Sequence, residues 1–389
     1  MKLVKAHCRN PGDGKPIAKE KLIEEVKFHI FKFNNRPKPV DKGRVLIITC
    51  FTEFGCESIA LLYCIPKIIQ QYPGSYVICV GWYGREYLYR HLVDEFWEIP
   101  EELQWLREYS DAFVHSSKNL EKLESSLSEF GNVYKGSCMG GICLGNTCRE
   151  CKNFWGETGD DLTCPKCKSK DIDKGVLNDV IRHRKTVVQV PRPSIKSIRK
   201  AKTYLKPNPV GIFARGRVRY GRNLTPEFYV KLINDLEVQG YNPIWLGEKQ
   251  SVLPCPVSHI IDFSRLPESR DLELTLAIVS QLDFTVQFWT ASTRLASMMG
   301  TPWLLFESGD QICRNGQEGL RIALTTDVNK KKLVLANYWD VVENEDKTLE
   351  LINQAIQEMN DDNWKSLFFL NSSEIGDFML QKFVDKNLL

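Results

Sequence analysis

The apolar positions divide the chain into two halves, each of which opens with a continuous apolar run. Residues 44–50 and 210–214 have the pattern of strands that are buried on both faces of a parallel sheet. In the first half, a helix with apolar periodicity is expected over 59–71 and a second strand over 76–81. This strand–helix–strand order predicts a parallel sheet that is covered by helices.

The second half repeats this alternation. Thr225 is expected to cap a helix that has Pro226 at its first position, and Gly240 is expected to end that helix. The expected elements are helices over 228–239, 271–280 and 292–299, strands over 243–246, 284–288 and 303–306, and a later amphipathic helix over 347–359. The predicted fold class is therefore α/β, with two Rossmann-like domains that face a cleft.

Composition restricts the class of protein. The chain has 389 residues, of which 43% are hydrophobic and 26% are charged, as is typical of a soluble globular protein with more than one domain. No run reaches the roughly 18 apolar residues of a membrane span. The first residues also lack the apolar core of a signal peptide, so we expect a cytoplasmic protein.

Positive charge is concentrated in one stretch, although the net charge is only +3. Residues 181–226 contain thirteen Lys and Arg residues and neither Asp nor Glu. Two interpretations remain open for this stretch. It is either a solvated basic linker or a surface that attracts a polyanion, such as a nucleotide, a nucleic acid or a phosphorylated acceptor.

Four of the thirteen cysteines have the spacing of metal ligands. Two C-x2-C pairs, separated by twelve residues, are formed by Cys148, Cys151, Cys164 and Cys167. This spacing predicts a zinc ribbon, in which four thiolates close a tetrahedral shell and leave no open position for catalysis. An iron–sulfur cluster is the alternative. The zinc would be structural, and the ribbon would either hold a loop together or bind the acceptor.

Two segments of the second half have the features of phosphate-binding sites. Arg215, Arg217 and Arg222 follow the strand predicted over 210–214, and guanidinium groups match phosphate oxygens with two parallel hydrogen bonds. The predicted helix over 292–299 begins in a segment rich in hydroxyl groups, and a helix N-terminus favours an anion. The residues of that segment that we expect to bind phosphate are Thr290, Ser292, Thr293 and Arg294. Together the two segments indicate a nucleotide-linked substrate.

These residues resemble the ADP-heptose:lipopolysaccharide heptosyltransferases and related GT-B glycosyltransferases. The first half keeps the layout of that family with Gly55, Pro66 and Tyr72-Pro73, and the run from Arg294 to Pro302 has the spacing of its His-Leu-Ala…Gly-x-Pro helix. The chain departs from the family where Trp289-Thr290-Ala291 replaces Asp-Ser-Gly and Arg294 replaces the histidine. The cysteine ribbon is also foreign to that family.

The resemblance implies a GT-B-like glycosyltransferase that uses a nucleotide-diphosphate sugar, without a donor metal and with inversion. Arg215 and Arg217 would hold the diphosphate, and Gly247 and Glu248 would lie near the base or ribose. Glu307 would accept hydrogen bonds from ribose hydroxyls. The general base that direct attack requires would be Glu53 or Glu57, in the loop after the first strand.

The domains expected on this interpretation are a lead-in over 1–42, an acceptor domain over 43–135, a zinc-ribbon insert over 136–180, a basic linker over 181–208, a donor domain over 209–345 and C-terminal helices over 346–389. The acceptor is unknown, and an anionic molecule or a nucleic acid is compatible with the charge. Two other functions remain open. One is a sugar-nucleotide epimerase, and the other is a zinc-ribbon protein that binds or modifies nucleic acid.

Overall fold

The chain divides by its internal contacts into two compact units, Met1–Val188 and Gln189–Leu389. The computed structural model describes residues 43–50, 62–98 except 83, 127–134 except 129, 146–155 except 149 and 152–153, 163–173 except 165, 190–216, 223–288 except 250–251, 293–308, 332–337 and 345–360. None of the helices in these ranges has the length and apolar character that a membrane span requires. Each unit is described by itself.

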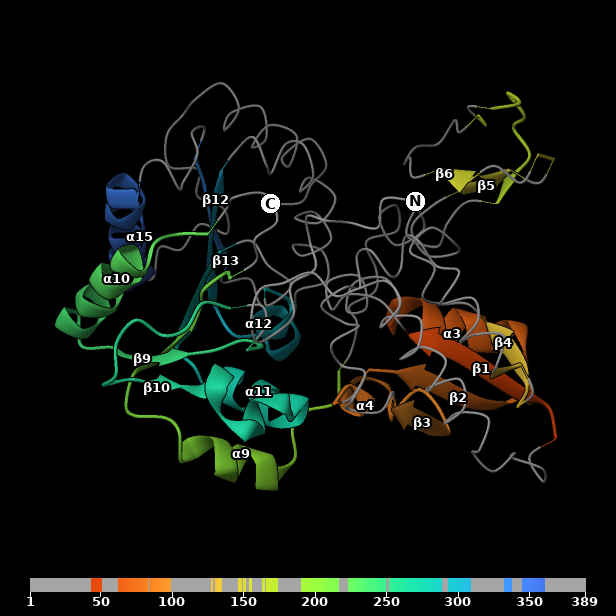
Figure 1. Ribbon diagram of the computed structural model, residues 1–389, viewed down its shortest axis with the longest axis horizontal. Helices are drawn as coiled ribbons and strands as arrows, with labels where there is room; N and C mark the ends of the chain where they lie inside the picture. The colour runs from red at the N-terminus through yellow and green to blue at the C-terminus, as the bar shows by residue number, and fades with distance from the viewer. Residues whose placement is uncertain are drawn as a thin grey trace, which may run out of the picture. The chain divides into compact units, whose positions relative to one another are not determined.

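The first unit contains a parallel sheet of four strands in the order β3-β2-β1-β4 (Figure 1). The strands are β1 Val45–Cys50, β2 Tyr76–Gly81, β3 Glu95–Glu98 and β4 Asn132–Tyr134. Every residue of β1 is buried, as the apolar run predicts. The helices described in this unit are α3 Leu62–Gln71 and α4 Glu86–Tyr89.

The second unit contains a parallel sheet of six strands in the order β10-β9-β8-β11-β12-β13. The strands are β8 Pro209–Phe213, β9 Asn242–Trp245, β10 Ile261–Asp262, β11 Phe284–Phe288, β12 Trp303–Ser308 and β13 Lys332–Asn337. Counted from β8, this is the order 3-2-1-4-5-6 of the doubly wound dinucleotide-binding fold. The order reverses between β8 and β11, which are hydrogen-bonded neighbours.

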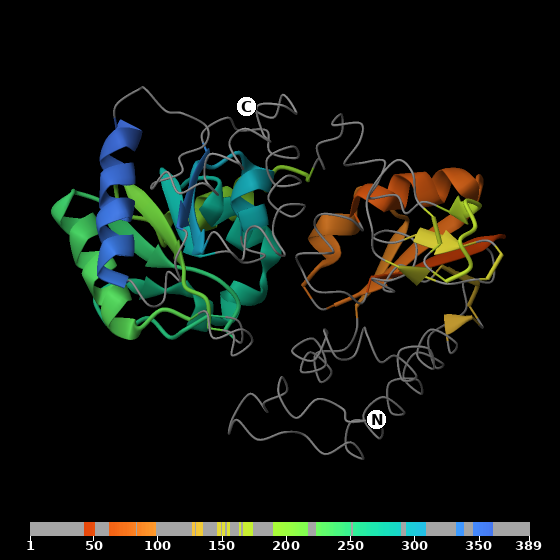
Figure 2. The same ribbon diagram turned by 90° about the horizontal axis from the view of Figure 1, so that it is seen from above.

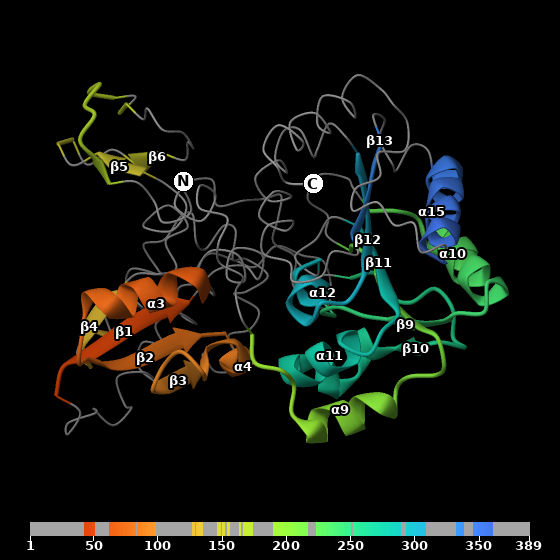
Figure 3. The same ribbon diagram turned by 180° about the vertical axis from the view of Figure 1, so that it is seen from behind.

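Helices cover both faces of the six-stranded sheet (Figure 2). One face carries α10 Pro226–Val238 and α15 Glu345–Asn360, whose apolar residues share a core with alternate residues of β8 and β11. The other face carries α9 Ile195–Lys202, α11 Leu272–Val279 and α12 Thr293–Met299 (Figure 3). Two short 3-10 helices, η4 Phe263–Arg265 and η5 Pro267–Arg270, precede α11. The sequence-based prediction of an α/β fold is confirmed in both units.

The predicted N-cap of α10, Thr225, is confirmed, and the same residue forms hydrogen bonds to α15. The hydroxyl of Thr225 accepts a hydrogen bond from the backbone N–H of Phe228 at 3.2 Å. The carboxylate of Glu345, at the start of α15, accepts from the backbone N–H of Thr225 at 2.6 Å and from its hydroxyl at 2.5 Å. The helix that the sequence places after the donor domain therefore packs within the second unit.

Part of the stretch expected to be a basic linker forms α9, which packs against α11. Ser194 caps this helix by accepting from the backbone N–H of Ser197 at 3.2 Å, and its own N–H donates to Glu273 at 2.8 Å. Ala201 is fully buried, whereas the lysines and arginines of the helix lie toward solvent. The many charged residues of this helix conceal its small apolar side in the sequence.

Candidate functional site

The carboxyl edge of the second sheet holds the described parts of the two segments that the sequence indicates as phosphate-binding, Arg215 and the start of α12. Arg215 follows the end of β8, and α12 begins five residues after the end of β11. Because β8 and β11 are neighbours at the reversal of strand order, the carboxyl ends of both strands lie at the topological switch point. In open α/β sheets this is the place where ligands bind.

Arg215 is a buried cation at this point, with only 6% of its surface exposed. Its backbone forms an isolated antiparallel bridge with Val252. The phenol of Tyr229, on α10, is completely buried nearby. Burial raises the pKa of Tyr229, whereas the backbone N–H and the charge of Arg215 act in the opposite direction. The tyrosine therefore stays neutral beside the guanidinium.

A loop after β9 closes across the ends of β8 and β9. Gly247 has a φ of +126°, and a Cβ atom added there would lie 2.3 Å from Cγ1 of Val252. A Cβ atom on Gly216 would lie 2.4 Å from the backbone carbon of Val252. Because the two glycines have no side chains, Val252 can pack directly against the chain beside Arg215. The loop also places Glu248 at this edge of the sheet.

Two side chains that the sequence does not single out hold this loop. Arg265, in η4, donates to the carbonyl oxygen of Lys249 at 3.2 Å and to that of Val252 at 3.4 Å. The indole of Trp245 donates to the carbonyl oxygen of Leu253 at 2.8 Å. These contacts join residues eight to sixteen positions apart, beyond the span of a local motif.

Some of the other predicted site residues lie within the described ranges, and some lie outside them. Gly247 and Glu248 lie in the loop just described, Thr293 and Arg294 begin α12, and Glu307 is the last residue but one of β12. The residues outside the described ranges are Glu53, Glu57, Arg217, Arg222, Thr290 and Ser292. Their roles stay predictions.

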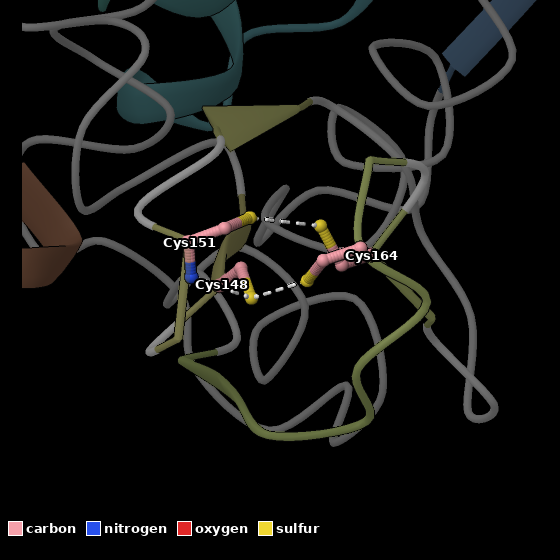
Figure 4. A group of neighbouring side chains, drawn as sticks. Cys148, Cys151 and Cys164 are labelled. Carbon is pink, nitrogen blue, oxygen red and sulfur yellow. Dashed lines mark hydrogen bonds between the residues drawn. The ribbon is translucent and has the colours of Figure 1, made fainter.

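The four predicted metal ligands lie together in the first unit. Figure 4 labels three of them, Cys148, Cys151 and Cys164. They flank a small antiparallel sheet with the strand order β6-β5-β7, formed by β5 Asn146–Cys148, β6 Phe154–Trp155 and β7 Ile172–Asp173. The Sγ atoms of Cys148 and Cys167 are 3.4 Å apart, and those of Cys151 and Cys164 are 3.5 Å apart. All four Sγ atoms lie within 4.8 Å of one another.

These distances fit a single metal ion. A disulfide joins sulfurs at about 2.05 Å, far shorter than the observed separations. A tetrahedral zinc ion with Zn–S bonds of about 2.3 Å places its sulfurs roughly 3.8 Å apart, close to what is observed. Four cysteines from two turns of one small sheet therefore form a cluster that can hold a metal.

Backbone groups of the two turns favour the thiolate form of the buried cysteines. The backbone N–H of Cys151 lowers the pKa of the Cys148 thiol. Burial opposes ionisation of Cys164, but the backbone N–H groups of Cys167 and Lys166 outweigh it and lower its pKa to about 6. Thiolates are the form that binds metal, so these N–H groups favour that form at Cys148 and Cys164. At Cys167 the backbone of Ser169 acts in the same direction, but hydrogen bonds to the neighbouring cysteines outweigh it and raise the pKa to about 12.

The chain is similar to solved structures at low sequence identity. No protein-family model matches the sequence, and no curated protein matches it.

The ADP-heptose lipopolysaccharide heptosyltransferase II of E. coli is 10% identical, with a TM-score of 0.48, and the match covers 81% of this chain and 99% of that one. A family 9 glycosyl transferase from Veillonella parvula is 9% identical, with a TM-score of 0.46 and coverage of 82% and 97%. The iron-containing heptosyltransferase TibC is 10% identical, with a TM-score of 0.43 and coverage of 82% and 77%.

Proposed function

We propose that the chain is a glycosyltransferase whose second unit binds a nucleotide-diphosphate sugar at the carboxyl edge of its sheet. The observation that carries the proposal is Arg215, a buried cation directly after β8 at the reversal of strand order. Ligands of open α/β sheets bind at this point. A guanidinium group can hold diphosphate oxygens with two parallel hydrogen bonds, which a lysine cannot do.

In the proposed reaction, an acceptor hydroxyl attacks the anomeric carbon of the sugar. A new carbon–oxygen bond forms while the bond from that carbon to the diphosphate oxygen breaks, and the diphosphate leaves with the electron pair. Arg215, joined by Arg217, stabilises the negative charge that grows on this leaving group. The proton of the acceptor passes to Glu53 or Glu57. Direct attack of this kind inverts the configuration of the sugar and needs no metal at the donor.

The remaining predicted residues complete the donor site in this proposal. Gly247 and Glu248 lie beside the base or ribose, in the loop after β9, where Val252 packs against Gly216. Glu307 accepts from ribose hydroxyls at the end of β12. The hydroxyl-rich start of α12 and Arg222 face the phosphates.

The experiment measures binding of ADP, GDP, UDP and their glucose conjugates by thermal shift and calorimetry. ADP is included because the sequence resemblance implies an ADP-sugar. We expect at least one of these compounds to raise the melting temperature of the wild-type chain. Arg215→Ala should lose about 2–4 kcal/mol of transition-state stabilisation, which is roughly a 30- to 1000-fold loss in transfer rate. Arg215→Lys should recover only part of this loss.

The matched control is Arg199→Ala, on the exposed side of α9. It removes the same charge from the same unit at a distance from the switch point, so binding and transfer should stay near wild type. Small, equal losses at Arg215 and Arg199 would contradict the proposal. Affinity for nucleic acid that falls steeply with salt would then favour the nucleic-acid-binding alternative.

We also propose that the cysteine cluster holds one structural zinc ion. The four sulfurs would complete the tetrahedral shell, so no position would remain for a water molecule or a substrate. The role of the metal would be to hold the two turns of the β5–β7 sheet together. An iron–sulfur cluster is the alternative for such a sulfur set, and metal analysis of the purified chain distinguishes the two.

A further inference from the structure

A buried glutamine lies one residue before the end of β11, and neither atom of its amide is hydrogen-bonded to a residue that the structure describes. Gln287 has no exposed surface, and within the described part of the chain neither its Oε1 nor its Nε2 has a hydrogen-bond partner. More than nine-tenths of buried polar groups in proteins are paired, because an unpaired one loses its hydrogen bonds to water without replacement. A glutamine kept in this condition points to a group that is supplied from outside the chain.

The surroundings of Gln287 explain why it finds no partner within the sheet. Its register neighbours are Phe213 on β8 and Leu305 on β12, and both are buried apolar residues. Two residues earlier, on the same face, the buried hydroxyl of Thr285 also has no partner among the described residues. The intervening residue Val286 packs into the core on the opposite face, with α10 and α15.

Gln287 is also close to the proposed diphosphate site. Arg215 lies two residues beyond Phe213, the register partner of Gln287. With strands about 4.8 Å apart and a rise of about 3.3 Å per residue, the Cα atoms of Arg215 and Gln287 are about 8 Å apart. Both side chains are long enough to contact one ligand at the strand ends. The amide offers one acceptor and one donor, which are complementary to neighbouring hydroxyl groups on a sugar ring.

We propose that Gln287 binds ring hydroxyls of the donor, beside the diphosphate held by Arg215. This inference rests on the proposed function of the second unit. One hydroxyl donates to Oε1 and its neighbour accepts from Nε2, as the vicinal hydroxyls of ribose or of the transferred sugar allow. The torsions of the glutamine side chain let the amide turn toward the strand end when the ligand binds. In the ligand-free chain the same amide is a source of instability.

The test compares Gln287→Met with Thr285→Val in the full chain. Methionine keeps the length of the side chain but removes both hydrogen-bonding atoms. We therefore expect the ligand-free melting temperature of Gln287→Met to rise by about 2–6 °C. Its affinity for the best binder among ADP, GDP, UDP and their glucose conjugates should fall by about tenfold or more. Thr285→Val should stabilise the chain in the same way and leave the affinity unchanged, because position 285 lies deeper in the strand.

Comparing each free diphosphate with its glucose conjugate distinguishes the hydroxyls of the ribose from those of the transferred sugar. Weaker binding of the free diphosphate by Gln287→Met identifies the ribose, whereas weaker binding of only the glucose conjugate identifies the transferred sugar. Unchanged affinity for both ligands overturns the inference while leaving the proposed function intact. A lower melting temperature in Gln287→Met also overturns it, because the amide then stabilises the fold itself. If no compound stabilises the wild-type chain, the proposed function fails and the inference fails with it.

Discussion

At the scale of single residues, the candidate site depends on a glycine that no other residue replaces without strain. Gly247 has a φ of +126°, and its missing side chain leaves room for Val252 beside Arg215. Gly247→Ala should lower the free energy of unfolding by about 1–3 kcal/mol, because alanine is strained at this φ and its Cβ atom displaces the loop. The displaced loop should also weaken donor binding. Denaturant unfolding and calorimetry measure the two effects.

The control for this substitution is Gly240→Ala, at the end of α10. Gly240 has a φ of +85°, but an added Cβ atom would meet nothing within 4 Å. Both variants should lose stability through backbone strain, and only Gly247→Ala should lose donor affinity. Equal affinity in the two variants would show that the loop after β9 takes no part in the site.

At the scale of elements, α10 and α15 are joined through their first residues. Thr225 caps α10 and donates to Glu345, and Lys231, six residues further along α10, pairs with Asp346 at 2.6 Å. Thr225→Ala should lower the free energy of unfolding by about 1–2 kcal/mol, because the cap and the contact to α15 are lost together. Glu345→Ala should cost less, since it leaves the hydroxyl of Thr225 able to cap α10.

A double-mutant cycle on Thr225 and Glu345 measures how strongly the two helices are coupled. We expect the double variant to be about 0.5–1 kcal/mol more stable than the sum of the single losses predicts, because both substitutions break the same contact. Strict additivity would mean that α15 is held by its apolar residues alone, such as Ile352 and Ile356, which are fully buried.

At the scale of the whole molecule, the cysteine cluster and the candidate donor site belong to different units. Chelation of the metal should therefore unfold the β5–β7 sheet and leave the response of the second unit to nucleotide unchanged. Metal analysis before chelation should find one zinc ion per chain, and Cys164→Ser should lower that content. Loss of nucleotide binding on chelation, with the second unit still folded, would show that the metal acts on the donor site.

Much of the fold was predictable from the sequence because parallel strands and amphipathic helices have local signatures. The strand over 284–288 and the cap at Thr225 were predicted where the structure has them. Strand β13 and helix α9 were missed. Strand β13 lies at the edge of the sheet, and the polar face of α9 dominates its composition.

The candidate sites also have features that were predictable from the sequence and features that were not. The metal cluster was predictable because two C-x2-C pairs at this separation are typical of a metal site, and the arginine after β8 was predictable from its position at a strand end. The contacts of Arg265 with the loop after β9 were not predictable, because they join residues sixteen and thirteen positions apart through tertiary packing. How the two units face each other stays a prediction.

The sequence by itself determined the α/β class, the alternation of strands and helices, and the cysteine pairs, because each of these depends on residues that are close along the chain. Only the tertiary structure decided the strand order, which places Arg215 and β11 at one switch point. It also decided the isolation of Gln287, whose polarity gives no local signal. Whether a buried amide is paired depends on what the neighbouring strands place beside it, and that information is not local.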